Sequence, residues 1–179
     1  LLQKDINEDM LGRNTVYFLP YLMGERTPIL DVNSRGVFFG LSAMHTKAHM
    51  SRAVLEGVSL SLLDCKQYLD GLSIPYKPVA TLIGGGAKGK IWGQITADAL
   101  GVTLRVTESS DSSLGSAMLA GIAVGVFKDA ENAVEKCVKE VDITYPNPEN
   151  TPKYYEVFKT YKKIHEGNWL NDEPYGVIH

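Results

Sequence analysis

Residues 79–106 read VATLIGGGAKGKIWGQITADALGVTLRV, and this stretch decides the fold. Its β-branched opening, Val79–Ile83, predicts a buried parallel strand, because the run is almost wholly apolar. Lys90–Leu100 predicts a helix, with Gly101 as its C-terminal stop, and Val102–Val106 predicts a second strand. The residues expected to turn inward from the helix are Ile91, Trp92, Ile95 and Ala99. A strand, a helix and a strand in this order indicate a parallel pair in an α/β layer.

The turn between the first strand and the helix is rich in glycine. Gly84, Gly86 and Gly89 have the spacing G-x-G-x-x-G, and the acidic Glu108 ends the second strand. This pattern is typical of an NAD-binding module, because glycines let the backbone approach a pyrophosphate and helix N-terminal amides favour its charge. A nucleotide-contacting turn of the actin and hexokinase type, or a tight turn without a ligand, fits the same residues. A P-loop fits poorly, because Ile91 stands where a Mg²⁺-binding hydroxyl is needed.

A long helix is predicted from Thr46, its N-cap, to Gly71. The apolar stripe expected to face the core is Met50, Val54, Val58, Leu62, Cys65 and Leu69. Leu55 and Leu63 widen this stripe, so we expect the helix to be covered on more than one side. Glu56, in mid-helix, is interpreted as a packing acid and not as a catalytic base.

The remaining predicted elements follow from shorter patterns. In chain order they are a short helix within residues 1–14, strands at Thr15–Leu19 and within Gly36–Leu41, a small-residue helix capped by Ser112 or Ser113, a helix from Ala130 to about Glu140, and a last helix with Thr151 as N-cap. The last helix carries an aromatic stripe that predicts core packing: Tyr154, Tyr155, Phe158, Tyr161 and Ile164.

Composition narrows the function classes. A net charge of -3 with scattered lysines and arginines argues against a nucleic-acid partner. No apolar run approaches the roughly 20 residues that span a bilayer, so no membrane partner is expected. Cys65 and Cys137 are interpreted as free thiols in a reducing compartment, and the four histidines lack metal-ligand spacing, so no metal site is assigned. We expect a cytoplasmic location, because no signal peptide opens the sequence.

Several motifs together resemble the FGGY family of carbohydrate kinases. They occur in family order over roughly residues 15–127. The matching segments are 18–28 (FLPYLMGERTP), 36–41 (GVFFGL), 49–57 (HMSRAVLEG), 84–88 (GGGAK), 97–98 (AD) and 114–117 (LGSA). By comparison, the dinucleotide fingerprint is a single short pattern, so the kinase interpretation is favoured.

The resemblance implies an α/β fold, namely part of the C-terminal ribonuclease-H-like domain of an actin/hexokinase-type ATPase, lacking its first strands. It implies transfer of the ATP γ-phosphate, with Mg²⁺, to a sugar hydroxyl. The nucleotide-binding residues implied are Gly85, Gly86, Ala87 and Gly89, with Lys88 as a possible further contact. No catalytic residue is assigned within the chain. The partners expected are therefore ATP and a small sugar.

Further expectations concern substrate and organisation. Within the family, the motifs look closest to members that phosphorylate xylulose to xylulose 5-phosphate, with gluconate or another sugar as the alternative. Residues 1–145 are expected to form a partial ATP-binding domain, and residues 146–179 a helix and tail packed on it. Because the family's catalytic base and sugar site match no segment of this sequence, we expect the chain alone to be inactive. With few strands available, an exposed sheet edge and a homodimer or other association through it are expected.

Overall fold

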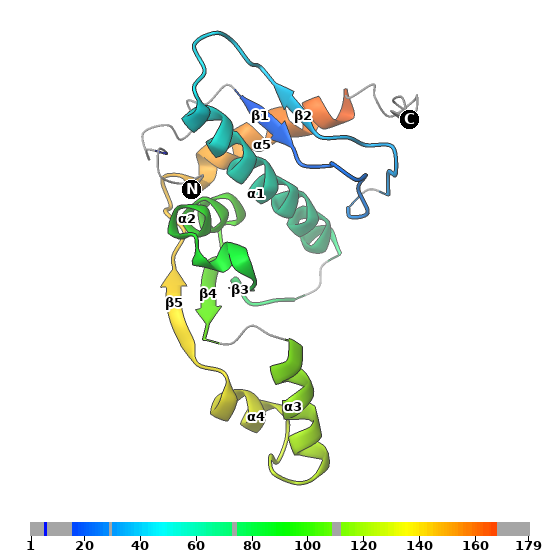
Figure 1. Cartoon of the computed structure of the whole chain (residues 1–179), viewed down its shortest axis with the longest axis vertical. Coiled ribbons are helices and arrows are strands. Elements are labelled where there is room, and N and C mark those ends of the chain that lie inside the picture. Colours follow the sequence, from blue (N-terminus) through cyan, green and yellow to red (C-terminus); the bar gives the residue numbers. More distant parts are fainter. Residues whose placement is uncertain (1–5, 7–15, 29, 73–74, 109–111, 168–179) are drawn as a thin grey trace.

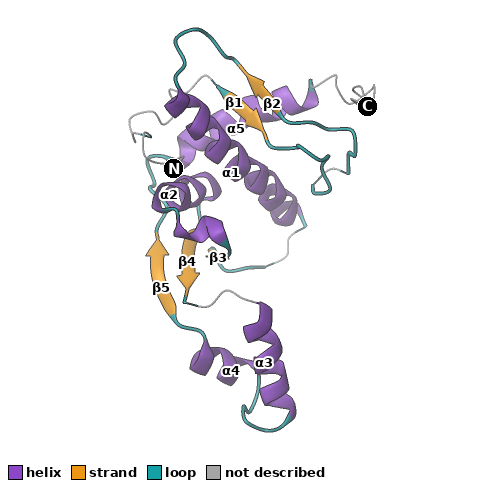
Figure 2. Cartoon of the chain, in the orientation of Figure 1, coloured by secondary structure: helices purple, strands orange, loops and turns teal. Residues whose placement is uncertain are grey.

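The computed structural model describes residues 6, 16–28, 30–72, 75–108 and 112–167. These residues form two small sheets linked and covered by helices (Figures 1 and 2). The strands are β1 (Tyr17–Leu19), β2 (Val37–Phe39), β3 (Val79–Leu82), β4 (Thr103–Thr107) and β5 (Glu140–Thr144). The helices are α1 (Lys47–Gly71), η2 (Gly85–Lys88, a 3₁₀ turn), α2 (Lys90–Leu100), α3 (Ser112–Ala123), α4 (Ala130–Cys137) and α5 (Thr151–Glu166).

The parallel pair predicted from residues 79–106 is confirmed. β3 and β4 run parallel, with Val79 opposite Thr103 and Leu82 opposite Val106, and α2 connects them. Gly101 ends α2 with a left-handed φ of 64°, as a glycine stop requires. β3 is less buried than predicted, because within the described residues it pairs with β4 alone and none of its residues is fully buried. In the described part of the chain, its outer edge is therefore unpaired.

The second sheet contains a strand that the sequence analysis missed. The predicted helix from Ala130 ends at Cys137, and β5 then pairs antiparallel with β4, Leu104 lying opposite Thr144. α3 and α4 lie in the connection between these two strands and pack on each other, away from the rest of the molecule (Figure 1). No residue of α3 is buried.

The buried face of α1 differs from the predicted stripe. Leu62 and Leu69 are exposed, whereas the residues buried on α1 include Arg52, Leu55 and Glu56 together with Ser59, Leu60 and Leu63. The prediction failed because polar residues on this helix have partners on other elements, so a purely apolar stripe does not mark the inner face. Thr46 precedes the helix as predicted, and its amide donates to His49 Nδ1 at 3.1 Å.

The main core lies where α1, α2, α5 and β1 meet. The aromatic stripe of α5 packs there as predicted, with Tyr154, Phe158 and Tyr161 buried beside Leu19 and Leu63. α5 begins one residue earlier than expected, because Asn150 is the N-cap and Thr151 is already helical. A smaller cluster of Ala97, Val102 and Leu104 joins α2 to the β3–β4–β5 sheet. The glycine turn is thus attached to a helix that is packed on both sides.

Candidate nucleotide-binding turn

The glycine turn connects the end of β3 to the start of α2. Gly84 has a φ of 81°, and its carbonyl accepts the Ala87 amide at 3.2 Å. The Gly89 amide donates to the Gly86 carbonyl at 3.0 Å, and α2 begins at the next residue. These bonds close a compact turn at the carboxyl end of a parallel strand, where α/β folds place ligands.

The positions of this turn differ in the physical reason for which each is occupied by glycine. Gly84 needs its positive φ, which other residues rarely adopt. A Cβ on Gly86 would lie 1.8 Å from Trp92 Cζ3, so that glycine makes room for the indole ring. Gly85 has neither reason, because its φ is not positive and no heavy atom lies within 4 Å of a Cβ built on it. Gly85 therefore presents bare, exposed backbone on the outside of the turn.

The N-terminus of α2 adjoins this bare backbone. Gly89 is the N-cap and has no side chain to bond the first amides, and the first turn contains no acidic residue. The first amides of a helix lack intrahelical partners and carry the positive end of the helix dipole. The turn and helix therefore offer backbone donors of the kind that bind phosphate groups.

The structure brings the sequence-predicted site residues together in one turn. Gly85, Gly86, Ala87 and Lys88 form η2, and Gly89 follows directly. Gly85 is exposed, whereas Gly86, Ala87 and Gly89 are half-buried. A contact of the Lys88 side chain with a nucleotide stays a prediction.

Glu108, the acidic residue of the dinucleotide interpretation, lies just beyond β4. Its amide donates to the Lys139 carbonyl at 2.9 Å, and its carboxylate lies 3.9 Å from Lys139 Nζ. The side chain is 65% exposed. Its backbone thus continues the pairing of β4 with the segment that enters β5.

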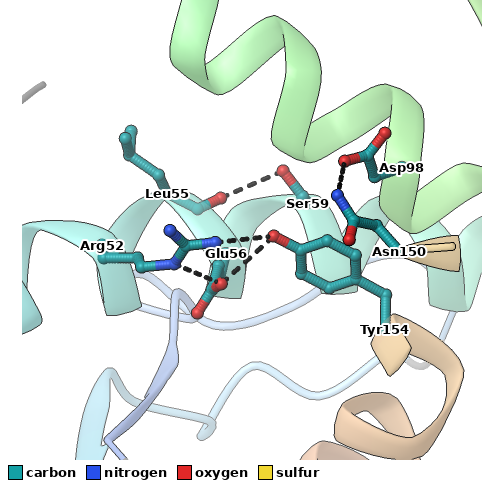
Figure 3. A network of polar contacts seen from close by, with 7 residues as sticks. All are labelled: Arg52, Leu55, Glu56, Ser59, Asp98, Asn150 and Tyr154. Carbon is teal, nitrogen blue, oxygen red and sulfur yellow. Dashed lines mark hydrogen bonds and ion pairs between the residues drawn. The ribbon is translucent and has the colours of Figure 1, made fainter. Parts of the chain in front are cut away.

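A buried polar network on α1 lies deeper in the molecule (Figure 3). Glu56 Oε1 accepts hydrogen bonds from Arg52 Nε at 2.7 Å and from the Tyr154 hydroxyl at 3.2 Å. Arg52 also donates to the Tyr154 hydroxyl at 3.2 Å, and burial, with Glu56 as the next cause, raises the pKa of Tyr154. Glu56 is therefore a packing acid, as interpreted from the sequence, and it joins α1 to α5.

Sequence reasoning gave no role to Asp98, which fastens α2 to the start of α5. Its carboxylate accepts hydrogen bonds from Gln94 Nε2 at 2.7 Å, the Asn147 amide at 2.7 Å and Asn150 Nδ2 at 3.0 Å. A cavity of about 530 Å³ lies beside these groups, between α1, α2 and the connection into α5. Residues of the glycine turn are not among those that line it, and Gln94 and Asn150 in its wall both donate to Asp98.

Within the described ranges, no helix is both long and apolar enough to cross a membrane. In the same residues, no three histidine, cysteine, aspartate or glutamate side chains form a group that could hold a metal ion.

Comparison with known proteins identifies the class. Residues 3–124 match the C-terminal domain of the FGGY family of carbohydrate kinases. A xylulose kinase of Staphylococcus epidermidis is 39% identical over 157 residues, which are 87% of this chain and 32% of that protein. The xylulose kinase of Escherichia coli is 44% identical over 115 residues, 63% of this chain and 24% of that protein.

Solved structures agree with the sequence relatives. The ligand-bound xylulose kinase of Lactobacillus acidophilus has a TM-score of 0.82 and 30% identity, covering 97% of this chain and 34% of that chain. The gluconate kinase of the same organism has a TM-score of 0.81 and 30% identity over the same shares. The chain spans about a third of the length of these relatives.

This chain belongs to the FGGY family of carbohydrate kinases. Its α/β fold is that of part of the family's C-terminal domain, of the actin/hexokinase ATPase type, as the resemblance implied. The comparisons give no support to an NAD-binding module built on Gly84, Gly86, Gly89 and Glu108.

Proposed function

We propose that the turn at Gly85–Gly89 is the nucleotide-binding part of an ATP-dependent carbohydrate kinase. The observation that carries the proposal is Gly85, a glycine that neither backbone conformation nor packing within the described residues requires. A missing side chain at such a place lets a ligand approach the main chain. The family membership makes ATP the ligand of choice.

The proposal assigns each predicted residue a task. Gly85, Gly86 and Ala87 contact the nucleotide through their backbone, and Gly89 leaves the first amides of α2 open to its phosphates. Lys88 adds a positive charge near the nucleotide. Mg²⁺ enters with ATP as part of the substrate, and we assign no residue of this chain to it. We propose no catalytic residue in the chain, so phosphoryl transfer by the 179 residues alone is not expected.

The acceptor we propose is xylulose, with formation of xylulose 5-phosphate. Relatives named as xylulose kinases support this choice at 33% to 44% identity. The similarity to a solved gluconate kinase makes gluconate the second candidate. Initial rates with MgATP and each sugar, measured on a protein that contains this chain, separate the two. A higher kcat/KM for gluconate than for xylulose would overturn the first choice.

Nucleotide binding is tested directly with the variant Gly85→Val. The added side chain has room in the free protein, so the thermal midpoint is expected to stay within the small range of surface substitutions. The affinity for MgATP, measured by calorimetric titration, is expected to fall about tenfold or more. Gly71→Val is the matched control, because a Cβ at Gly71 also has no neighbour within 4 Å and lies at the end of α1.

Three results contradict the proposal. The first is unchanged MgATP affinity in Gly85→Val, and the second is an equal loss in Gly71→Val. The third is a larger thermal stabilisation of the wild-type chain by NAD than by MgATP.

The cytoplasmic location stays a prediction from the sequence.

We further propose that the chain associates through the edge of β3. In the part of the chain that the structure describes, β3 pairs only with β4, so its other edge is unpaired. An unpaired strand edge offers a row of amide and carbonyl groups to another strand. Light scattering of the purified chain is expected to show species larger than 19.7 kDa. A monodisperse monomer contradicts association, and it does not affect the assignment of the nucleotide turn.

A further inference from the structure

The indole ring of Trp92 lies against the glycine turn. Trp92 is the third residue of α2, and its Cζ3, Cε3 and Cη2 atoms all lie within 2.8 Å of the place where a Cβ on Gly86 would be. This distance is far below any real carbon–carbon contact, so Gly86 and the ring fit together only because Gly86 has no side chain. The ring therefore fixes the inner side of the turn, opposite the bare backbone of Gly85.

The other end of the indole is bonded to α1. Trp92 Nε1 donates to Ser59 Oγ at 3.2 Å, and Ser59 Oγ lies 2.8 Å from Thr96 Oγ1. Ser59 also donates its single hydroxyl proton to the Leu55 carbonyl at 3.0 Å, a bond drawn in Figure 3. Since a serine hydroxyl has one proton and two lone pairs, Trp92 and Thr96 are its two donors.

Ser59 is therefore a fully bonded, fully buried acceptor at the contact between α1 and α2. A buried hydroxyl with all its bonds made has one favoured orientation, because any displacement leaves a polar group without a partner. The indole that it holds is restrained accordingly. In addition to the packing of α1 against α2, one hydrogen bond and one ring contact thus tie the glycine turn to α1.

We infer that Trp92, held by Ser59, is a positioning residue for the nucleotide-binding turn. The inference rests on the proposed function only in taking the ligand of the turn to be a nucleotide. The restraint that Trp92 places on the turn concerns the chain without ligand. Trp92 touches Gly86 from the inside and does not need to contact the ligand. Its task is to hold the turn, which the Ala87 and Gly89 amide bonds close, so that the first amides of α2 lie where the phosphates are bound.

The test compares hydrogen exchange in Ser59→Ala with that in Ser61→Ala. Ser61 is the matched control, because its hydroxyl donates to the Val58 carbonyl of the same helix, at 2.9 Å, and bonds no other element among the described residues. Ser59→Ala removes the acceptor of both Trp92 and Thr96, and loss of the Trp92 hydrogen bond alone, about 1 kcal/mol, corresponds to about a fivefold change in a local equilibrium. In Ser59→Ala the Ala87 and Gly89 amides are expected to exchange about fivefold faster, while the amides of α2 beyond Thr96, the other residue of α2 bonded to Ser59, change little.

A merely structural role gives another pattern. If Ser59→Ala accelerates exchange throughout α2 equally, or leaves Ala87 and Gly89 as in Ser61→Ala, the inference is overturned.

A second measurement uses Gly86→Ala alone and combined with Trp92→Leu. The single change is expected to destabilise the chain strongly. In the Trp92→Leu background the smaller side chain is expected to remove most of that loss, as contacting residues couple. Additive losses contradict the contact.

Affinity separates this inference from the proposed function. If the wild-type chain binds MgATP, Ser59→Ala is expected to raise its Kd about fivefold and Ser61→Ala to leave it unchanged. If the wild-type chain binds no MgATP, the proposed function fails, and the exchange data still decide whether Trp92 positions the turn. The chain has two tryptophans, Trp92 and Trp169, so the indole-proton signal that remains in Trp169→Phe belongs to Trp92.

Discussion

The hydroxyl oxygens of Tyr21 and Tyr161 lie 2.8 Å apart in the core, although 140 residues separate them in sequence. Tyr161 donates to Tyr21, and both side chains are almost completely buried. The bond joins the loop that follows β1 to α5. Burial raises the pKa of Tyr21 to about 12, and burial raises the pKa of Tyr161 as well.

Tyr161→Phe is predicted to lower the free energy of unfolding by about 1–2 kcal/mol, because it removes a buried donor and leaves the Tyr21 hydroxyl without that partner. Urea unfolding at neutral pH measures the change. Tyr155→Phe, on the same helix and only partly buried, is the control. An equal loss in both variants would show that the hydrogen bond between the two hydroxyls is unimportant.

Mild acid is predicted to weaken the fold through His165. Burial lowers the pKa of His165, with Asp64 opposing this effect and Lys162 supporting it. Below the unfolded pKa of about 6.5, the unfolded chain takes up a proton that the folded chain resists, so stability falls as the pH decreases. Comparing unfolding at pH 7 and pH 5, we expect a smaller decrease in His165→Phe than in the wild type. An equal decrease in His165→Phe and in the wild type would contradict the prediction.

Glu56→Leu is predicted to destabilise the chain by about 3 kcal/mol or more, because Arg52 is left charged inside the protein. The Arg52 and Glu56 side chains are only 3% and 8% exposed. The control is Asp70→Asn, which weakens the more exposed pair with Lys66 at the same i,i+4 spacing and is expected to destabilise the chain much less. Thermal unfolding of the two variants, side by side, checks the difference. Similar losses would count against the role of burial.

Asp98→Ala is predicted to loosen the start of α5, because the amide of Asn147 and the side chain of Asn150 lose their acceptor. The expected loss is about 1–3 kcal/mol, since charged hydrogen bonds are stronger than neutral ones. Asp142→Ala, on the exposed strand β5, is the control. Circular dichroism followed during urea titration is the measurement, and equal midpoints would contradict the prediction.

The part of the fold that local patterns encode could be predicted from the sequence. The β3–α2–β4 unit follows from an apolar run, a glycine turn and a helical stripe, all within residues 79–106. The inner face of α1 could not be predicted, because Arg52 and Glu56 are buried through Tyr154, which lies about 100 residues away. Polar residues look external until their distant partner is known.

The missed strand β5 has a different cause. Val141 and Ile143 alternate with polar residues, which is a strand signal, but the stretch continues a helical pattern that began at Ala130. Both apolar side chains are well exposed within this chain, so burial does not reinforce the signal. Its pairing with β4 across a long connection is not visible in local sequence.

The candidate site was predicted as a group, but the reasons for its glycines were not. The spacing of Gly84, Gly86 and Gly89 fitted ligand contact and also a tight turn without a ligand. In the structure, Gly86 makes room for Trp92 and Gly84 serves backbone geometry, whereas Gly85 has neither reason, and only three-dimensional contacts reveal this difference. The family motifs supplied the ligand class that the turn alone left open.

The connection that carries α3 and α4 leaves and re-enters the sheet at one point. The Glu108 amide is bonded to the Lys139 carbonyl at 2.9 Å, so the two ends of this excursion already meet as neighbours in a hairpin do. A tight turn in its place would join β4 to β5 without moving either strand. The projecting pair of helices, which carries the family segment 114–117, is therefore anchored to the sheet at its base and packs mainly on itself.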